Sequence, residues 1–366
     1  MSLDRKFDES LARLAAQAQD ADAYSAWPAA SWDALCDSGA LRWCIPAEYG
    51  GLGLEGPEIL LGYERLAGAC LTTCFILSQR DSACRRLRES KNDALSQELL
   101  PALAAGKNFA TVGLSQLTTS HQHTGPALRA ALVHDRIILD GTVPWVTGAS
   151  QADHIVVGGT LEDTRQILAV APRGARGVEI EPPLPLMALE GSMTAQIRCR
   201  SAGIDRRWLL AGPAERVMGP GRGGTGGVET SCLALGLAGA AIEYLKGETR
   251  NRADLGPITE RLEQSRQAVR AEIHALVQRA YTPAEAAALR ARANSLVLRS
   301  TQAALTASKG TGFLRDHPAQ RWARQALFFL VWSCPRPAAE ATLDSLIPAE
   351  DCLFPSADDR GQAGCN

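Results

Sequence analysis

The chain has 366 residues, of which 46% are hydrophobic and 21% are charged, and its formal net charge is -2. This length predicts about two to three domains, and the balanced charge argues against a nucleic acid or an anionic lipid surface as a partner. We find neither a signal-peptide pattern nor an apolar run long enough to span a bilayer, so we expect a cytoplasmic protein that does not enter a membrane.

Residues 1–108 are expected to form an all-helical N-terminal domain. Apolar residues recur there at intervals of three and four, which is the spacing of one helix face. Gly39 predicts the end of one helix, because glycine readily adopts the left-handed conformation found there. Pro57 predicts the start of another, since a proline is tolerated in the first helical position. One such apolar stripe consists of Phe7, Leu11 and Leu14.

Residues 109–215 are expected to form a middle β domain, because the apolar period changes to two. Segment 129–148 alternates apolar and polar residues, and Asp140 followed by Gly141 is typical of a tight turn between two strands. Further alternating segments of similar length follow along this region. Several short strands at this spacing predict a small β sandwich or barrel.

Residues 216–350 return to helical periodicity and are expected to form a C-terminal four-helix bundle, followed by a tail at 351–366. Thr282, Pro283 and Glu285 have the arrangement of a capping box with proline in the first helical position. We therefore interpret Glu285 as a helix cap and not as a catalytic acid. The predicted fold class is α+β and multidomain, with a β domain between two helical ones.

The ten cysteines do not predict disulfides, because the chain is long and carries no export signal. Four of them lie inside apolar stretches, where a thiol behaves as a small hydrophobic side chain. These are Cys70, Cys74, Cys232 and Cys334. Cys70 and Cys74 lack the second pair of cysteines or histidines that a common metal-binding spacing requires, so no metal site is expected.

Two local strings resemble signatures of the acyl-CoA dehydrogenase family, whose order of helical, β and helical domains matches the prediction above. The string "IPAEYGGLG" at residues 45–53 is similar to the family's Pro-Glu-Glu-Tyr-Gly-Gly-Leu-Gly loop. The string "GTVPWVTGASQADHIVV" at residues 141–157 resembles a segment that lines the flavin of the family. The resemblance implies that FAD is the cofactor, with FMN or a lost flavin as alternatives.

The resemblance also implies which residues hold the flavin. Trp145 would stack beside the ring and Thr147 would hydrogen-bond it near N5. Further flavin contacts would come from Leu114 and Ser115, and from Ser120 and His121, which stand where the family has a Gly-Ser pair. Gln116 and Leu117 replace the family's Glu-Pro.

The family's flavin site is completed by a second subunit, so the resemblance implies a homodimer or homotetramer. Arg252 matches an arginine that pairs with the cofactor pyrophosphate of the neighbouring subunit, and an arginine suits this role because its guanidinium is bidentate. Gly310 and Gly312 match the family's glycine segment near the same cofactor. Implied partners are an acyl-CoA or acyl-carrier-protein substrate and an electron-transfer flavoprotein.

The residues that match the family's two catalytic-base positions are Ser333 and Gly226, and neither is a carboxylate. The family reaction needs a base for the proton next to the thioester carbonyl. Glu229 lies about one helical turn beyond Gly226 and is the candidate base. The alternative is that Glu229 is an ordinary acid in the first turn of a helix, where the helix dipole favours it.

Three functions therefore remain open from the sequence. The first is α,β-dehydrogenation of an acyl thioester by a flavin-dependent oxidoreductase with a relocated base. The second is a flavin-dependent monooxygenase on the same fold, which needs no base at either position. The third is a catalytically silent scaffold that binds an acyl group or a partner. The aromatic residues of the segment "RWARQALFFLVWSCPRP" are expected to fill the core, and the alternative for Trp332 is a place in the wall of the acyl pocket. The prolines of this segment predict an early end of its helix.

Overall fold

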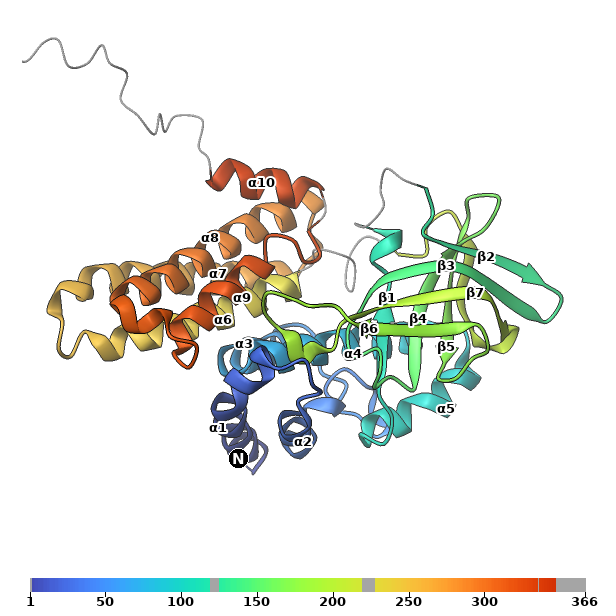
Figure 1. Cartoon of the computed structure of the whole chain (residues 1–366), viewed down its shortest axis with the longest axis horizontal. Coiled ribbons are helices and arrows are strands. Elements are labelled where there is room, and N and C mark those ends of the chain that lie inside the picture. The colour runs from blue at the N-terminus through green and yellow to red at the C-terminus, as the bar shows by residue number, and fades with distance from the viewer. Residues whose placement is uncertain (1, 119–124, 219–227, 335, 347–366) are drawn as a thin grey trace, which may run out of the picture.

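The computed structural model describes residues 2–118, 125–218, 228–334 and 336–346. A group of helices, a twisted sheet and a second group of helices follow one another along the chain and pack around a shared core (Figure 1). This arrangement confirms the predicted fold class of a β domain between two helical ones. The N-terminal helices are α1 (Ser2–Ala23), α2 (Ala29–Ser38), α3 (Pro57–Ala69), α4 (Leu71–Glu89) and α5 (Asp93–Ala104).

Local signals for the ends of the N-terminal helices are confirmed. Gly39 caps α2 with φ of 78°, in the left-handed region, and Pro57 begins α3. In the loop at residues 45–53, Gly50 and Gly53 also have positive φ. A side chain on Gly51 would overlap the carbonyl oxygen of Ile45, so this loop needs glycine for space as well as for conformation.

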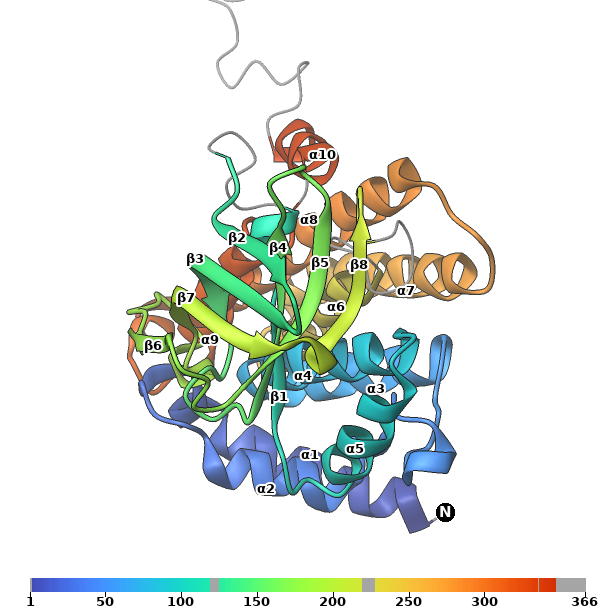
Figure 2. The same ribbon diagram turned by 90° about the vertical axis from the view of Figure 1, so that its right-hand side faces the viewer.

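The middle region forms one eight-stranded sheet (Figure 2). Its strand order is β6-β7-β3-β2-β4-β5-β8, and β1 pairs with β4 in parallel. The strands are β1 (Ala110–Gly113), β2 (Leu128–Val133), β3 (Arg136–Val146), β4 (His154–Thr160), β5 (Gln166–Pro172), β6 (Val178–Pro183), β7 (Ala195–Asp205) and β8 (Leu209–Ala214).

The prediction of a turn at Asp140 and Gly141 is wrong. Both residues lie inside β3, and the turn between β2 and β3 falls at His134 and Asp135. Gly141 has φ of 122° and sits at a register shift between β3 and β7. A Cβ at this position would lie 2.2 Å from the carbonyl oxygen of Ala127. The glycine therefore serves an irregularity in the strand, which in sequence looks the same as a hairpin turn.

The C-terminal helices are α6 (Val228–Glu248), α7 (Gly256–Val277), α8 (Pro283–Ala307), α9 (Pro318–Phe328) and α10 (Arg336–Leu346). Helix α6 packs against both α8 and α3, which joins the two helical regions. At the crossing with α3, a Cβ on Gly236 would lie 2.2 Å from the carbonyl oxygen of Glu64. By length and composition α6 resembles a membrane span, but 78% of its apolar window is buried inside the protein, as in a core helix.

The capping box before α8 is confirmed. The Thr282 hydroxyl accepts a hydrogen bond from the backbone N–H of Glu285, and the Glu285 carboxylate accepts one from the backbone N–H of Thr282. Arg279 also pairs with Glu285, and these contacts lower the pKa of the Glu285 carboxyl to about 2. Glu285 is a structural residue, as its place in the sequence indicates.

The prolines near the end of the chain do not end helix α9, contrary to the prediction. The helix ends at Phe328, and the turns that follow reach Ser333, which has φ of 47°. Pro337 lies inside the next helix, α10. The carbonyl oxygens of Phe329 and Trp332 accept hydrogen bonds from the buried Arg290 of α8, and these contacts hold the turns in place.

Candidate active site

A cavity of about 650 Å³ lies where the sheet meets both groups of helices. Helix α4 lines one side, and the first turn of α6 and the segment after α9 line others. Strands β1 and β3 supply the side that belongs to the sheet. Of the predicted site residues, five line this cavity: Leu114, Ser115, Trp145, Thr147 and Glu229. Residues about 115 positions apart are thus brought to one place, on elements that neighbour each other in Figures 1 and 2.

The sheet side of the cavity offers an aromatic surface next to hydroxyl groups. Trp145, near the end of β3, lines the cavity and is 49% exposed, although the core positions of the same strand are fully buried. Thr147 is buried and shares a hydrogen bond with Thr194, at 3.3 Å between their oxygens. The Ser115 Oγ is buried and has no hydrogen-bond partner among the described residues. A buried hydroxyl without a partner indicates a place for a polar ligand atom.

Other predicted cofactor residues do not line the cavity of this chain. Arg252 donates a hydrogen bond to the carbonyl oxygen of Ala307 and pairs with Asp254. Gly310 and Gly312 lie in the short helix η7 (Lys309–Phe313), just after Ala307. These residues therefore form a separate group at the end of α8. Ser120, His121 and Gly226 lie outside the described residues.

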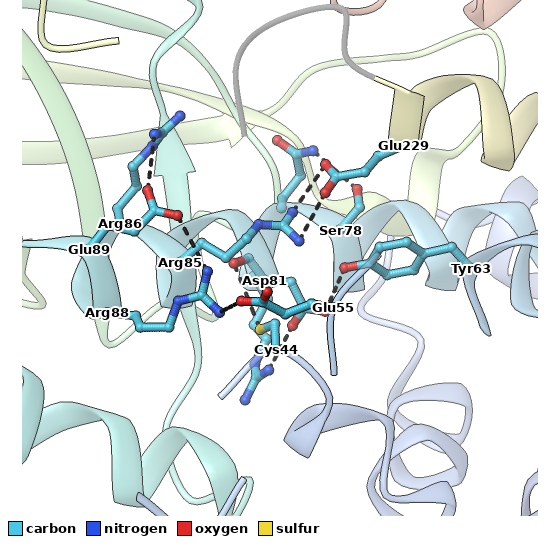
Figure 3. Close-up of polar contacts among 12 residues, drawn as sticks. Cys44, Glu55, Tyr63, Ser78, Asp81, Arg85, Arg86, Arg88, Glu89 and Glu229 are labelled. Carbon is cyan, nitrogen blue, oxygen red and sulfur yellow. Dashed lines mark hydrogen bonds and ion pairs between the residues drawn. The ribbon is translucent and has the colours of Figure 1, made fainter. Parts of the chain in front are cut away.

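Glu229 enters the cavity from the first turn of α6 and forms an ion pair with Arg85 of α4 (Figure 3). The two carboxylate oxygens face the two terminal nitrogens of the guanidinium, at 3.1 Å from Nη1 to Oε1 and 3.2 Å from Nη2 to Oε2. Burial lowers the pKa of Arg85, but the charge of Glu229 and other neighbouring groups raises it by more. The pKa of Arg85 therefore lies well above its ordinary value. Arg85 is therefore a permanent cation in the wall of the cavity.

Sequence reasoning missed Arg85 and the polar face on which it lies. Ser78, Ser82 and Arg85 follow one another at intervals of four and three along α4, and all three line the cavity. Polar residues at helical spacing inside a mostly buried helix are a signal that was present in the sequence. The contact with Glu229 was not predictable, because it joins residues 144 positions apart.

An aromatic cluster from α4, α9 and the turns after α9 forms another wall of the cavity. Phe328 and Trp332 stack with ring centres 5.1 Å apart, and Phe75 of α4 meets each of them edge-on at 5.0 Å. Trp332 also packs against the core, and all three line the cavity. Ser333 also lines it, but from a turn and not from a helix as expected. Aromatic rings of this kind bind apolar groups through their large surface.

The buried carboxylate of Asp22 holds α9, the helix that carries Phe328 of the aromatic wall, in place. Asp22 of α1 is fully buried and accepts hydrogen bonds from Arg324 and Gln325 of α9, at 2.7 and 2.8 Å. It also accepts one from the backbone N–H of Leu189, and Arg324 donates to the carbonyl oxygen of Met187. Arg324 pairs with Asp22 and Arg321 donates a hydrogen bond to Gln19, so the arginines of α9 tie this helix to α1.

The buried cluster of Cys44, Asp81 and Cys84 has ligand atoms within 4.8 Å of one another. Arg80 and Tyr63 already donate hydrogen bonds to the two carboxylate oxygens of Asp81, each at 2.7 Å. A buried guanidinium in contact with this group disfavours a metal cation there. As expected, Cys70, Cys74 and Cys232 are also buried, whereas Cys334 is only partly buried.

Comparison with known proteins agrees with this geometry. The family model described as "Acyl-CoA dehydrogenase, N-terminal domain" matches residues 4–107. The chain is 24% identical over 340 residues to the probable acyl-CoA dehydrogenase YngJ of Bacillus subtilis (strain 168), covering 86% of this chain and 88% of that relative. It is 22% identical over 307 residues to a short-chain-specific acyl-CoA dehydrogenase of Clostridium acetobutylicum, covering 76% and 79%.

Solved structures show the same fold. Butyryl-CoA dehydrogenase from Megasphaera elsdenii superposes with a TM-score of 0.79 at 18% identity, over 94% of this chain and 98% of that one. A glutaryl-coenzyme A dehydrogenase in complex with glutaryl-CoA gives 0.81 at 16% identity, over 94% and 95%. Residues 4–107 thus match the N-terminal domain of the acyl-CoA dehydrogenase family, and the chain has the fold of the acyl-CoA dehydrogenases.

Proposed function

We propose that this protein is a flavin-dependent oxidoreductase that removes two hydrogens from the α and β carbons of an acyl thioester. The observation that carries the proposal is that Trp145, Thr147 and the carboxylate Glu229 line one cavity, together with an aromatic wall. Such a site combines an aromatic surface for a planar cofactor, a proton acceptor and an apolar surface for an acyl chain. The relatives named above are dehydrogenases of acyl-CoA.

The residues of the cavity fit a flavin. The partly exposed Trp145 offers a surface for the ring, and the unpartnered Ser115 Oγ and the Thr147 hydroxyl offer hydrogen bonds. When bound, the flavin would accept the hydride that leaves the β carbon. FAD is the proposed form, because Arg252, Gly310 and Gly312 form a group that suits a long dinucleotide reaching in from a second subunit.

Glu229 is the proposed base for the α proton. Its carboxylate lines the same cavity as Trp145, and it belongs to the first turn of α6. The aromatic wall would exclude water from the acyl chain. Removal of a proton by Glu229 and loss of a hydride from the neighbouring carbon together leave a double bond between the two carbons.

Carrier and assembly are part of the same proposal. One structural neighbour is a prolyl acyl carrier protein oxidase, and another belongs to work on an electron transferring flavoprotein. We therefore retain both an acyl-CoA and an acyl carrier protein as carriers of the substrate, and an electron-transfer flavoprotein as the electron acceptor. A homodimer or homotetramer and a cytoplasmic location remain predictions from the sequence.

An anaerobic absorbance titration tests this function. The purified protein with bound flavin is mixed with acyl-CoA esters of increasing length, and the flavin absorbance is followed. Dehydrogenation predicts that at least one ester bleaches the flavin without oxygen and forms the unsaturated product. If the flavin keeps its absorbance with every ester, the proposed reaction is wrong.

One observation favours the monooxygenase as a second candidate. Both oxygens of Glu229 are engaged by Arg85, which leaves the carboxylate less available as a base. A monooxygenase would consume oxygen with an externally reduced flavin and would not be reduced by the acyl ester. The same titration, repeated with oxygen and a chemical reductant, therefore separates the two functions.

A further inference from the structure

Arg85 lines the cavity, and one edge of its guanidinium has an N–H group without a partner among the described residues. A guanidinium carries five N–H groups, and Glu229 occupies only the end formed by the two terminal nitrogens. The Nε atom is buried and has no hydrogen-bond partner among the described residues. The whole residue is only 9% exposed, so this cation is held at a fixed place.

This free edge has the geometry that recognises a carboxylate. Nε and the adjacent terminal nitrogen present two parallel N–H groups, which match the two oxygens of a carboxylate. A buried donor without a partner destabilises the protein, and a ligand that supplies the acceptor removes this cost. A plain alkyl chain supplies no acceptor, so it would leave Nε as it is.

We propose that Arg85 binds a carboxylate on the acyl group of the substrate, so that the preferred substrates are thioesters of short dicarboxylic acids. This inference rests on the proposed function, since it names the substrate class of the same site. The chain between the two carbonyl groups is short, because Arg85 directly contacts Glu229, the group that takes the α proton. The carboxylate and the reacting carbon must therefore both lie close to this ion pair.

The same contact explains how a base held by an arginine becomes active. A substrate carboxylate on Arg85 shares the positive charge that otherwise belongs to Glu229 alone. It also places a second negative charge near Glu229, and a neighbouring like charge favours uptake of a proton. Glu229 then receives the α proton, and a bound flavin would supply the acceptor for the hydride of the β carbon. Glu229 thus becomes available as a base when a substrate with a second carboxylate binds to Arg85.

The first test measures binding and does not need turnover. Calorimetric titration of the protein, with its flavin bound, compares succinyl-, glutaryl- and adipyl-CoA with butyryl-, valeryl- and hexanoyl-CoA, which have the same chain lengths without the second carboxylate. Hydrogen bonds to a charged group are worth about 1.5–3 kcal/mol, so at least one dicarboxylic ester is expected to bind about 10-fold tighter or more. Equal binding within every pair would overturn the proposal.

Variants of Arg85 assign the preference to this side chain. Arg85→Met is expected to abolish the preference, and Arg85→Lys, which keeps the charge but loses the fork, to reduce it. Arg88→Met is the matched control, because Arg88 lies on the same helix, pairs with Glu55 and Glu89, and does not line the cavity. A preference that survives in Arg85→Met would contradict the proposal. Circular dichroism checks that each variant is folded. If Arg85→Met does not fold, the binding of paired esters to the wild type still tests the proposal.

A further variant tests the competition between Glu229 and the substrate. Glu229→Gln removes the resident carboxylate, so dicarboxylic esters are expected to bind tighter to it than to the wild type. Weaker binding of dicarboxylic esters to Glu229→Gln than to the wild type would contradict the proposal that Glu229 and the substrate carboxylate share Arg85. Failure of the proposed function is separate: if the binding preference is present but no ester bleaches the flavin, the Arg85 site stands and the dehydrogenation does not.

Discussion

Asp81→Ala is expected to lower the free energy of unfolding by about 3–5 kcal/mol. Asp81 is fully buried and pairs with Arg80, whose side chain is 1% exposed. Asp81 also accepts a hydrogen bond from the Tyr63 hydroxyl, which burial leaves without another partner in the described residues. Removal of this carboxylate leaves the buried guanidinium of Arg80 without its counter-charge, and this unpaired charge lowers the free energy of unfolding.

Urea unfolding followed by circular dichroism measures this loss. Asp163→Ala is the control, because Asp163 pairs with Arg165 where both side chains are about half exposed. Exposed ion pairs contribute about 0–1 kcal/mol, so the control should unfold almost like the wild type. A similar, small loss in both variants would mean that the buried pair contributes no more than a surface pair.

Glu229→Gln is expected to slow reduction of the flavin by an acyl thioester by about 100- to 10,000-fold, the usual range for loss of a general base. Glutamine has nearly the same shape as glutamate but cannot take up the α proton at neutral pH. Rapid anaerobic mixing measures the rate of bleaching. Glu243→Gln is the matched control, because Glu243 is an exposed acid of the same helix and does not line the cavity.

An unchanged rate in Glu229→Gln would show that the base lies elsewhere. A slow rate in both variants would point to a general disturbance of α6 and not to a role of Glu229 in proton transfer. Flavin content and thermal unfolding of each variant separate these outcomes. Only a selective loss in Glu229→Gln, with the flavin still bound, supports the assignment.

Signals that act within a few residues were sufficient for much of the fold. Gly39, Pro57 and the capping box at Thr282 each predict a helix end from local backbone chemistry, and each is confirmed. The change of apolar period likewise predicted a β region between helices. These features depend on hydrogen bonds and conformations of neighbouring residues, so the sequence contains all the information that they need.

Errors arose where one local pattern suits two structures. Asp140 and Gly141 have the composition of a hairpin turn, but β3 continues through them because β7 pairs with both halves of the strand. The end of α9 at Phe328 depends on Arg290, which binds carbonyl groups of the turns that follow. Contacts between distant segments decide both cases, and local propensity cannot report them.

The candidate site was only partly accessible to sequence reasoning. The strings that resemble the family led to Trp145 and Thr147, and the structure places both in the cavity. Glu229 was found by its distance from the expected base position, but its partner Arg85 was not found. Their contact depends on the crossing of α4 and α6, which is a property of the tertiary structure.

The central claim is that the cavity beside Trp145 holds a flavin ring, and equilibrium titration of the flavin-free protein with FAD and FMN tests it most directly. We expect saturable binding that quenches tryptophan fluorescence. Aromatic contacts contribute about 0.5–1.5 kcal/mol, so Trp145→Ala should weaken binding by about 2- to 12-fold. Tyr24→Ala, which removes an exposed aromatic ring outside the cavity, should leave binding unchanged. Absence of binding by either flavin, or equal affinity in Trp145→Ala and the wild type, would contradict the account.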